Sequence, residues 1–272
     1  MKFFSLMFFG ILLTTPALNC RAADLSRAAC GTIPLAYYEN GALYYRNADG
    51  SYAGIDKDVV EEVARRTGCH FNTVLESRIR IWTQLNNGTL AMSVSGIATP
   101  EREKAARFIP YFATRNYALL HKDAPLSAQT MEGFLADPKL QIAIVKSFRH
   151  GDLYDEWISK LRAQNRVHEG PDFESVMRLF AIRRVDAVLA LPTGWQPLLK
   201  RENLLGKVQI KDWSPHDRVV ASLILSRTLV DQDQYQLIEK AIISMREDGS
   251  LEQIFKRHVG PEIARELRYS EK

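Results

Sequence analysis

The most constraining feature of the sequence is a succession of helix, turn and buried strand that occurs once in each half of the chain. In the first half, a predicted helix at 80–87 ends at Gly88 and leads to an apolar strand at 90–94. In the second half, an amphipathic helix at 173–184 leads to an apolar strand at 185–191. Short apolar runs of this kind are typical of strands buried on both faces. Because each strand needs its own covering helices, the sequence predicts two α/β lobes.

The remaining segments continue this alternation of strands and helices. A helix is predicted at 56–67, with Gly68 as its C-terminal stop, between strands at 31–37 and 70–74. Further strands are expected at 117–121, 140–145, 208–210 and 219–225, and further helices at 152–162, 232–247 and 251–258.

Residues 1–23 have the pattern of an export signal. Lys2 is followed by an apolar run at 3–13 and then by small residues up to Ala22 and Ala23. The apolar run is shorter than the roughly 20 residues that a membrane-spanning helix needs. We therefore expect a periplasmic protein. Lipid attachment at Cys20 is an alternative that we do not favour, because Asn19 is bulkier than the residues that usually precede such a cysteine.

Composition and motifs exclude several classes of function. The formal charge of +4 falls by two when Lys2 and Arg21 leave with the signal, and no basic run with interleaved aromatic residues is present. We therefore expect no nucleic-acid partner. The sequence has no glycine-rich phosphate loop and no nucleophile-elbow serine, and its six histidines lack metal-ligand spacing. We expect neither a metal nor another cofactor.

Two cysteines, Cys30 and Cys69, remain once the signal is removed. Each stands just before a predicted strand, and one helix separates the two strands, as in a βαβ unit of two parallel strands. Neighbouring parallel strands would bring both cysteines to the same edge of the sheet. Since an exported chain folds in an oxidising setting, we predict a disulfide rather than two buried free thiols.

The segment 95–102 carries the strongest indication of a binding site. Thr99 can act as N-cap and Pro100 as first residue of a predicted helix. This places Arg102 in the first turn, where free backbone N–H groups and the helix dipole already favour an anion. An arginine can hold a carboxylate with two parallel hydrogen bonds. The alternative is an exposed arginine paired with Glu101 or Glu103.

Six short motifs resemble, in order and spacing, those of extracellular solute-binding proteins of family 3, the periplasmic polar amino-acid-binding proteins. They are GIDKD at 54–58, SRIR at 77–80, LNNG at 85–88, TPER at 99–102, VDAV at 185–188 and EDGSL at 247–251.

The resemblance implies the type II periplasmic-binding-protein fold. In this fold two lobes, each a mixed, mostly parallel sheet flanked by helices, are joined by two crossing strands that act as a hinge. We expect residues 24–117 and 218–272 to form lobe 1 and residues 118–217 to form lobe 2. The resemblance also implies a monomer that captures a small carboxylate or amino acid for an ABC permease complex. Sensor subunits and enzymes such as cyclohexadienyl dehydratase use the same scaffold and remain alternatives.

The resemblance assigns ligand-binding roles by position. The arginine equivalent to Arg102 binds the ligand α-carboxylate, helped by the preceding turn, which here contains Ser95, Gly96 and Thr99. That turn is one residue shorter than usual, with Ile97 and Ala98 where a second hydroxyl is expected.

Two other regions are expected at the ligand. In the second lobe, the turn with Ser147 and Arg149 is either a second anion contact or a solvated helix start. Near the first strand, Tyr37, Asn40 and Tyr44 occupy the region where the family supplies an acid and an aromatic platform, although tyrosines at strand ends often serve only in packing.

Leu191 is the largest departure from the family pattern. It stands where an aspartate usually binds the ligand ammonium, and burial of an unpaired ammonium costs several kcal/mol. We therefore expect the cleft to tolerate or prefer an organic acid without an α-amino group, unless Glu76 or Asp217 supplies the missing acid. A dehydratase would need a positioned acid or base, for which Glu76, Asp217 and His150 are the candidates.

Overall fold

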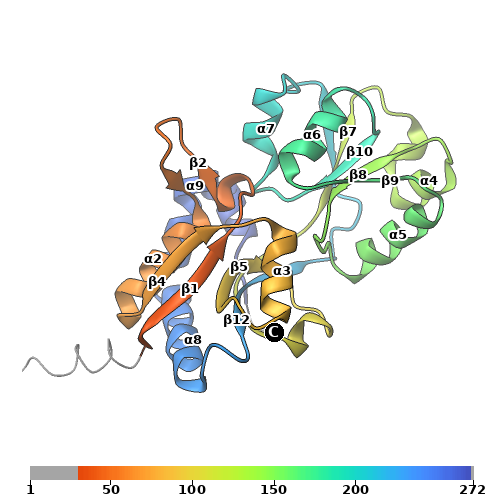
Figure 1. The fold of residues 1–272 in the computed structure, drawn as a ribbon. Helices are drawn as coiled ribbons and strands as arrows, with labels where there is room; N and C mark the ends of the chain where they lie inside the picture. The colour runs from red at the N-terminus through yellow and green to blue at the C-terminus, as the bar shows by residue number, and fades with distance from the viewer. Residues whose placement is uncertain (1–29, 271–272) are drawn as a thin grey trace, which may run out of the picture.

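The computed structural model describes residues 30–270, so the predicted signal at 1–23 and Cys20 lie outside the described residues. Figure 1 shows two α/β lobes, each built on one five-stranded sheet with helices on both faces. The expected two-lobe architecture is confirmed. Among residues 30–270, no helix combines the length and apolarity that crossing a membrane requires.

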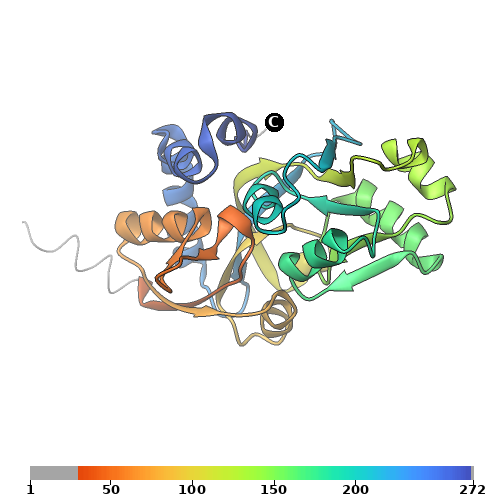
Figure 2. The ribbon, with the colours of Figure 1, turned by 90° about the horizontal axis from the view of Figure 1, so that it is seen from above.

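The sheet of the first lobe has the strand order β4-β1-β5-β12-β6. β1 is parallel to β4 and β5, whereas β12 runs antiparallel to β5 and β6. Helices α2, α8 and α9 pack against one another on one face, and α3 covers the other (Figure 2). The bounds are β1 Thr32–Tyr37, α2 Ile55–Thr67, β4 His70–Leu75, α3 Arg78–Asn86, β5 Met92–Gly96, β6 Ala106–Thr114, β12 Val219–Ser226, α8 Gln232–Glu247 and α9 Ser250–Glu266, with a short hairpin of β2 Tyr45–Arg46 and β3 Tyr52–Ala53.

The sheet of the second lobe has the strand order β11-β7-β10-β8-β9. β8 is parallel to β9 and β10, and β7 runs antiparallel to β10 and β11. The bounds are β7 Tyr117–His121, α4 Met131–Ala136, β8 Ile142–Val145, α5 Asp152–Ala163, β9 Val167–Gly170, α6 Phe173–Ala181, β10 Ala187–Ala190, α7 Trp195–Arg201 and β11 Val208–Lys211.

The apolar strands of the second lobe are buried on both faces because alternate residues enter different cores. Ala118 and Leu120 of β7 belong to one cluster, which includes Trp157 of α5. Leu119, between them, belongs to the other cluster with Phe180 of α6. Successive side chains of a strand point to opposite faces, so an uninterrupted apolar run can fill two layers at once.

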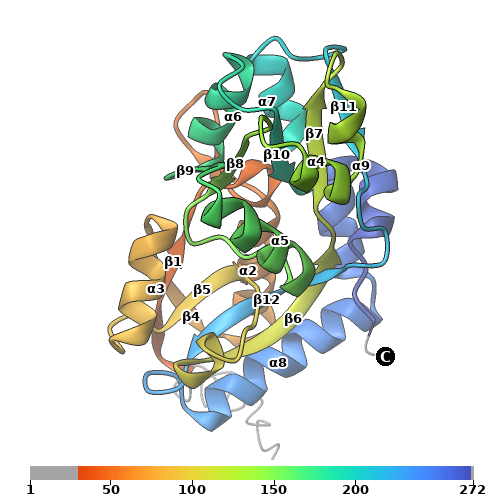
Figure 3. The same cartoon turned by 90° about the vertical axis from the view of Figure 1, so that its right-hand side faces the viewer.

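The chain passes between the lobes twice. It leaves the first sheet at the end of β6, enters the second at the start of β7 through residues 115–116, and returns between β11 and β12 through residues 212–218. Figure 3 shows β6 continuing into β7 on one side of the molecule, with α5 and β8 above the first lobe. Residues from both lobes therefore meet along the boundary between the two sheets.

The prediction of a helix that begins at Pro100 is wrong. Thr99 Oγ1 does accept a hydrogen bond from Arg102 N at 3.3 Å, but only a single 3₁₀ turn, Arg102–Lys104, follows. The chain then enters β6, which pairs along the whole of β12 with one register shift that leaves out Tyr111. Buried aromatic residues such as Tyr111 and Phe112 favour this strand, so tertiary pairing overrides the local helix signal.

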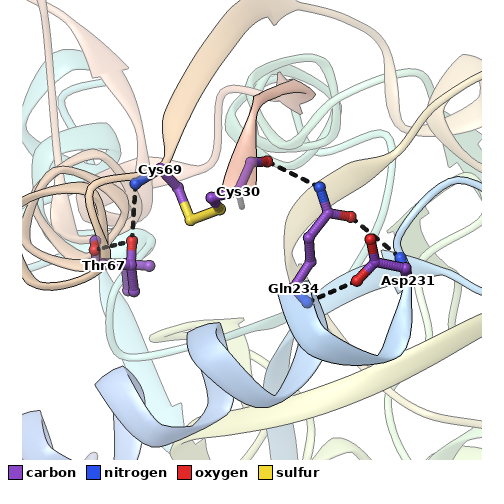
Figure 4. The surroundings of a disulfide bond; sticks show 6 residues. Cys30, Thr67, Cys69, Asp231 and Gln234 are labelled. Carbon is purple, nitrogen blue, oxygen red and sulfur yellow. Dashed lines mark hydrogen bonds between the residues drawn. A yellow bond between two sulfur atoms is a disulfide. The ribbon is translucent and has the colours of Figure 1, made fainter. Parts of the chain in front are cut away.

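The predicted disulfide between Cys30 and Cys69 is confirmed, and its Cα atoms are 5.1 Å apart. The bond joins the starting ends of β1 and β4, which are parallel neighbours as expected. Figure 4 shows the supporting contacts: Thr67 Oγ1 accepts from Cys69 N at 3.1 Å, and Gln234 of α8 donates to Cys30 O at 2.8 Å. The bond therefore ties the edge strand β4 to the interior of the sheet.

Reduction of this disulfide should lower the free energy of unfolding by about 4 kcal/mol. The two cysteines are 39 residues apart in the sequence, and without the bond the unfolded chain gains the conformational entropy of this open loop. Chemical unfolding with and without a reductant measures the difference. Thiol labelling of the unreduced, denatured chain that starts after residue 23 should modify neither cysteine. Modification of both would contradict the assignment.

Candidate functional site

A cavity of about 420 Å³ lies between the two lobes. The first lobe contributes the loop after β1 and the start of α3, and the second contributes the ends of β8 and β10 and the start of α6. Its walls include Tyr38, Glu39, Asn40, Leu75, Glu76, Ser77, Arg78, Arg80, Asn116, Val145, Phe148, His150, Pro171, Asp172, Phe173, Leu189, Ala190, Leu191 and Gly194.

Four side chains around this cavity carry buried polar atoms without a hydrogen-bond partner. They are Asn40 Nδ2 and Arg78 Nε and Nη1 from the first lobe, Asn116 Oδ1 from the crossing segment, and, from the second lobe, His150 Nδ1, which lies 3.7 Å from Asp155 Oδ1. Asn116 Nδ2 donates to His150 O at 2.7 Å, which fixes the orientation of the amide. Buried polar groups are nearly always paired, so this concentration around one cavity indicates a polar ligand.

Arg78 is a buried cation of the cavity wall. It is the first residue of α3 and only 3% exposed. Nη2 donates to Ser95 O at 3.3 Å, and the guanidinium lies 4.3 Å from the ring centroid of Tyr38 and 5.6 Å from that of Phe148 in the other lobe. The Ser77 side chain caps this helix by accepting a hydrogen bond from Arg80 N. An N-cap followed by an arginine in the first turn, the arrangement predicted for Thr99 and Arg102, is therefore found at Ser77 and Arg78.

Beneath the cavity wall lies a buried carboxylate, Asp56. Ser95 Oγ is 2.8 and 2.9 Å from its two oxygens, and Tyr111 OH donates to the same group. Burial raises the pKa of Asp56 to about 7, against the lowering effect of these hydrogen bonds and of Arg78. The hydroxyl of Ser95 is therefore engaged with Asp56, and only its carbonyl is directed toward Tyr38 and Arg78.

Arg102, the predicted carboxylate anchor, joins the two lobes. Nη1 donates to Ile97 O at 2.9 Å in the first lobe, and Nη2 donates to Ser147 O at 3.0 Å in the second. The guanidinium lies 3.9 Å from the ring centroid of Trp82. Burial, together with the charges of Arg78 and Arg149, lowers the pKa of Arg102 to about 9, so it stays protonated at neutral pH.

Arg102, Ser147 and Arg149 line a separate cavity of about 310 Å³ on the other side of Phe148. Arg149 lies 3.8 Å from Glu101 of the first lobe and 3.7 Å from Asp155. The structure thus brings together three of the predicted ligand-binding residues, but around this cavity rather than the larger one.

The remaining predicted residues of the first lobe divide into two groups. Asn40 lines the large cavity, whereas Tyr37 and Tyr44 stack on each other with ring centroids 4.3 Å apart in the interior of the lobe. Thr99 caps the 3₁₀ turn. Gly96 lies where a side chain would collide with Ile224 of β12, which explains the need for glycine.

In the second lobe, Leu191 lines the large cavity directly after β10, as expected for the end of that strand. Of the two acids named as substitutes for the missing aspartate, Glu76 lines the same cavity and is paired with Arg80 at 3.2 Å. Asp217 is not part of this wall and lies beside Gly151. Nearby Asp152 and Asp155 add to the effect of burial in raising the pKa of Asp217.

Comparison with known proteins identifies the class. The model of the bacterial extracellular solute-binding proteins, family 3, matches residues 37–261, and the chain belongs to this family. A search of curated proteins found no match.

Solved structures share the fold at low sequence identity. ArgBP from T. maritima is 17% identical with a TM-score of 0.70, covering 87% of this chain and 98% of its own. An ancestral arginine-binding protein bound to glutamine is 18% identical with a TM-score of 0.72, covering 85% and 98%. AncCDT-1, an ancestral amino acid-binding protein described as a precursor of cyclohexadienyl dehydratase, is 18% identical with a TM-score of 0.69, covering 87% and 99%.

The raised pKa of Asp56 predicts that stability falls as pH rises. In the folded state Asp56 keeps its proton up to about pH 7, whereas the unfolded chain releases it near pH 4. The folded state therefore binds more protons across this range, and the free energy of unfolding declines by at most about 1.4 kcal/mol per pH unit. Urea unfolding between pH 4.5 and 8 should show this slope for the wild type and lose it in Asp56→Asn. Asp123→Asn, at an exposed ion pair with Arg183, is the control that should keep the slope.

Replacement of Arg102 should shift the lobes apart. Arg102→Ala removes the bond to Ser147 O, and a charged hydrogen bond contributes about 1.5–3 kcal/mol. The closed form should therefore be disfavoured by about tenfold or more. Small-angle scattering of the ligand-free protein should give a larger radius of gyration for this variant than for wild type. Arg178→Ala, at an exposed pair with Glu174, is the matched control, and equal radii for all three proteins would refute the role.

Proposed function

We propose that this chain is a periplasmic solute-binding protein that captures a small carboxylate-bearing ligand, an amino acid or related organic acid, between its lobes and delivers it to an ABC importer. The observation that carries the proposal is that four residues lining one cavity, Asn40, Arg78, Asn116 and His150, each have a buried polar atom without a hydrogen-bond partner. The family match supports the same conclusion.

The distribution of these groups suits capture by closure. Asn40 and Arg78 belong to the first lobe and His150 to the second, so a ligand that satisfies all of them must contact both lobes. Each unmade buried hydrogen bond costs about 1–3 kcal/mol. A ligand that supplies the missing partners therefore stabilises the closed arrangement more than the open one, which is the basis of hinge closure.

Binding rather than catalysis is the function that we propose for this cavity. A dehydratase needs an acid or base free to exchange protons with its substrate. Of the three candidates for that role, Glu76 is paired with Arg80, Asp217 is not part of the cavity wall, and His150 Nδ1 lies 3.7 Å from Asp155 Oδ1. Incubation of candidate acids with the protein followed by mass spectrometry tests this point, and conversion of a bound acid to a product would favour the enzyme.

Leu191 generates a prediction about the ligand. Because an apolar side chain occupies the wall where the family places an ammonium partner, the cavity should bind an organic acid at least as tightly as the amino acid of the same skeleton. Calorimetry on protein stripped by unfolding and refolding can compare phenylalanine with 3-phenylpropionate, leucine with 4-methylpentanoate, and glutamate with glutarate. Leu191→Asp should move the preference toward the amino form.

Two outcomes would contradict the proposal. If no carboxylate in these pairs raises the melting temperature or binds in calorimetry, capture of a small acid is refuted. If every amino acid binds more tightly than its des-amino partner, the expectation from Leu191 is refuted and another acid must hold the ammonium.

Uptake measurements in cells test the importer role. Uptake of the bound acid should stop when the gene is deleted and should return when a plasmid supplies a copy of it.

A further inference from the structure

The two sides of the cavity differ in chemistry. The first lobe presents the cations Arg78 and Arg80, the acids Glu39 and Glu76, and the polar groups of Tyr38, Asn40 and Ser77. Of these charged residues, Glu76 and Arg80 pair with each other. The second lobe presents His150 and Asp172, but mainly apolar side chains: Val145, Phe148, Pro171, Phe173, Leu189, Ala190 and Leu191. A ligand that fills this space must therefore be polar at one end and apolar along its body.

Arg78 is the group suited to the polar end. Two of its nitrogen atoms, Nε and Nη1, have no hydrogen-bond partner although the residue is 97% buried, and the ion pairs among residues 30–270 do not include it. The neighbouring carboxylate, Asp56, already accepts hydrogen bonds from Ser95 and Tyr111. A buried guanidinium without an acidic partner is costly, and an anionic ligand would remove that cost.

The position of Arg78 adds to its attraction for an anion. It begins α3, a helix of nine residues whose start, from Ser77, lies in the cavity wall. The N-terminal end of a helix carries partial positive charge from its unpaired N–H groups. The Tyr38 ring beneath the guanidinium holds its plane in place, so the fork is oriented before a ligand arrives.

Arg102 is committed elsewhere. Both terminal nitrogens of its guanidinium donate to carbonyl oxygens, one in each lobe, and it lines the other cavity. Arg102 is not among the residues that line the large cavity in this arrangement. The family resemblance assigned carboxylate binding to Arg102, whereas in this structure Arg102 joins the two lobes.

We propose that Arg78 holds the ligand carboxylate and that the ligand is an apolar monocarboxylate, with an aromatic or branched aliphatic body packed against the second lobe. This inference rests on the proposed function. The cavity volume of about 420 Å³ is within the range of small-molecule sites and has room for a body of the size of one ring.

Calorimetry on the stripped wild type should test the ligand class first. The apolar panel is benzoate, phenylacetate, 3-phenylpropionate and 4-methylpentanoate, and the polar panel is succinate, glutarate, glutamate and lysine. At least one apolar acid should bind thirtyfold more tightly than every polar compound. Tighter binding of a polar acid would overturn this inference and leave the proposed function standing, whereas binding of neither panel would overturn both.

Matched variants then test the anchor. The two probes are the apolar acid that binds wild type most tightly and the neutral primary amide of that acid. Arg78→Gln should lower the affinity for the acid at least thirtyfold, so that acid and amide bind with similar affinities. Arg102→Gln should weaken acid and amide by the same factor, since its bonds join protein to protein. Arg78→Lys keeps the charge without the fork and should fall between wild type and Arg78→Gln.

The opposite pattern would refute the assignment. If Arg102→Gln abolishes the preference for the acid while Arg78→Gln keeps it, Arg102 is the anchor. Thermal unfolding checks that each variant is folded. If neither Arg78 variant folds, the wild-type preference for acid over amide and for apolar over polar acids still decides the ligand class, and its absence overturns the inference.

Discussion

A fully buried carboxylate must be hydrogen-bonded, and the contacts of Asp56 determine the geometry of the first-lobe wall. Ser95, near the end of β5, has a φ of 50°, a conformation that costs a residue with a side chain about 1 kcal/mol or more. Its hydroxyl contact with Asp56, and the donation of Ser95 N to Tyr111 OH, stabilise that conformation. In consequence the Ser95 carbonyl accepts from both Tyr38 and Arg78, which sets the base of the cavity.

The same arrangement explains how two arginines are buried close together. Their mutual repulsion contributes to the lowered pKa of Arg102. Carbonyl dipoles compensate Arg102 on both sides, and aromatic faces cover both guanidinium groups. Arg78 donates to only one carbonyl oxygen, and its Nε and Nη1 atoms have no hydrogen-bond partner, so its positive charge is compensated less than that of Arg102. The first-lobe wall of the cavity thus contains a buried cation with two nitrogen atoms that have no hydrogen-bond partner.

The sequence predicted the fold well because periodicity and start and stop signals are local. α2, β7 and α8 begin and end within one residue of expectation, and the disulfide followed from strand order. β6 was missed because its pairing with β12 joins segments more than one hundred residues apart. At the site, Arg78 belongs to one of the six family motifs, but its sequence context does not mark it as buried, because its burial depends on Tyr38 and on Phe148 of the other lobe. Sequence spacing cannot show which of two arginines has its donors already engaged.

The bond from Arg102 to Ser147 has a kinetic consequence. It contains no ligand atom, so it lowers the free energy of the closed form whether or not the cavity is filled. A stronger bond of this kind slows escape of a captured molecule, because the lobes separate less often. It also slows capture, because fewer ligand-free molecules stand open at any moment. Exchange rates can therefore be adjusted at this contact while the groups that recognise the solute remain unchanged.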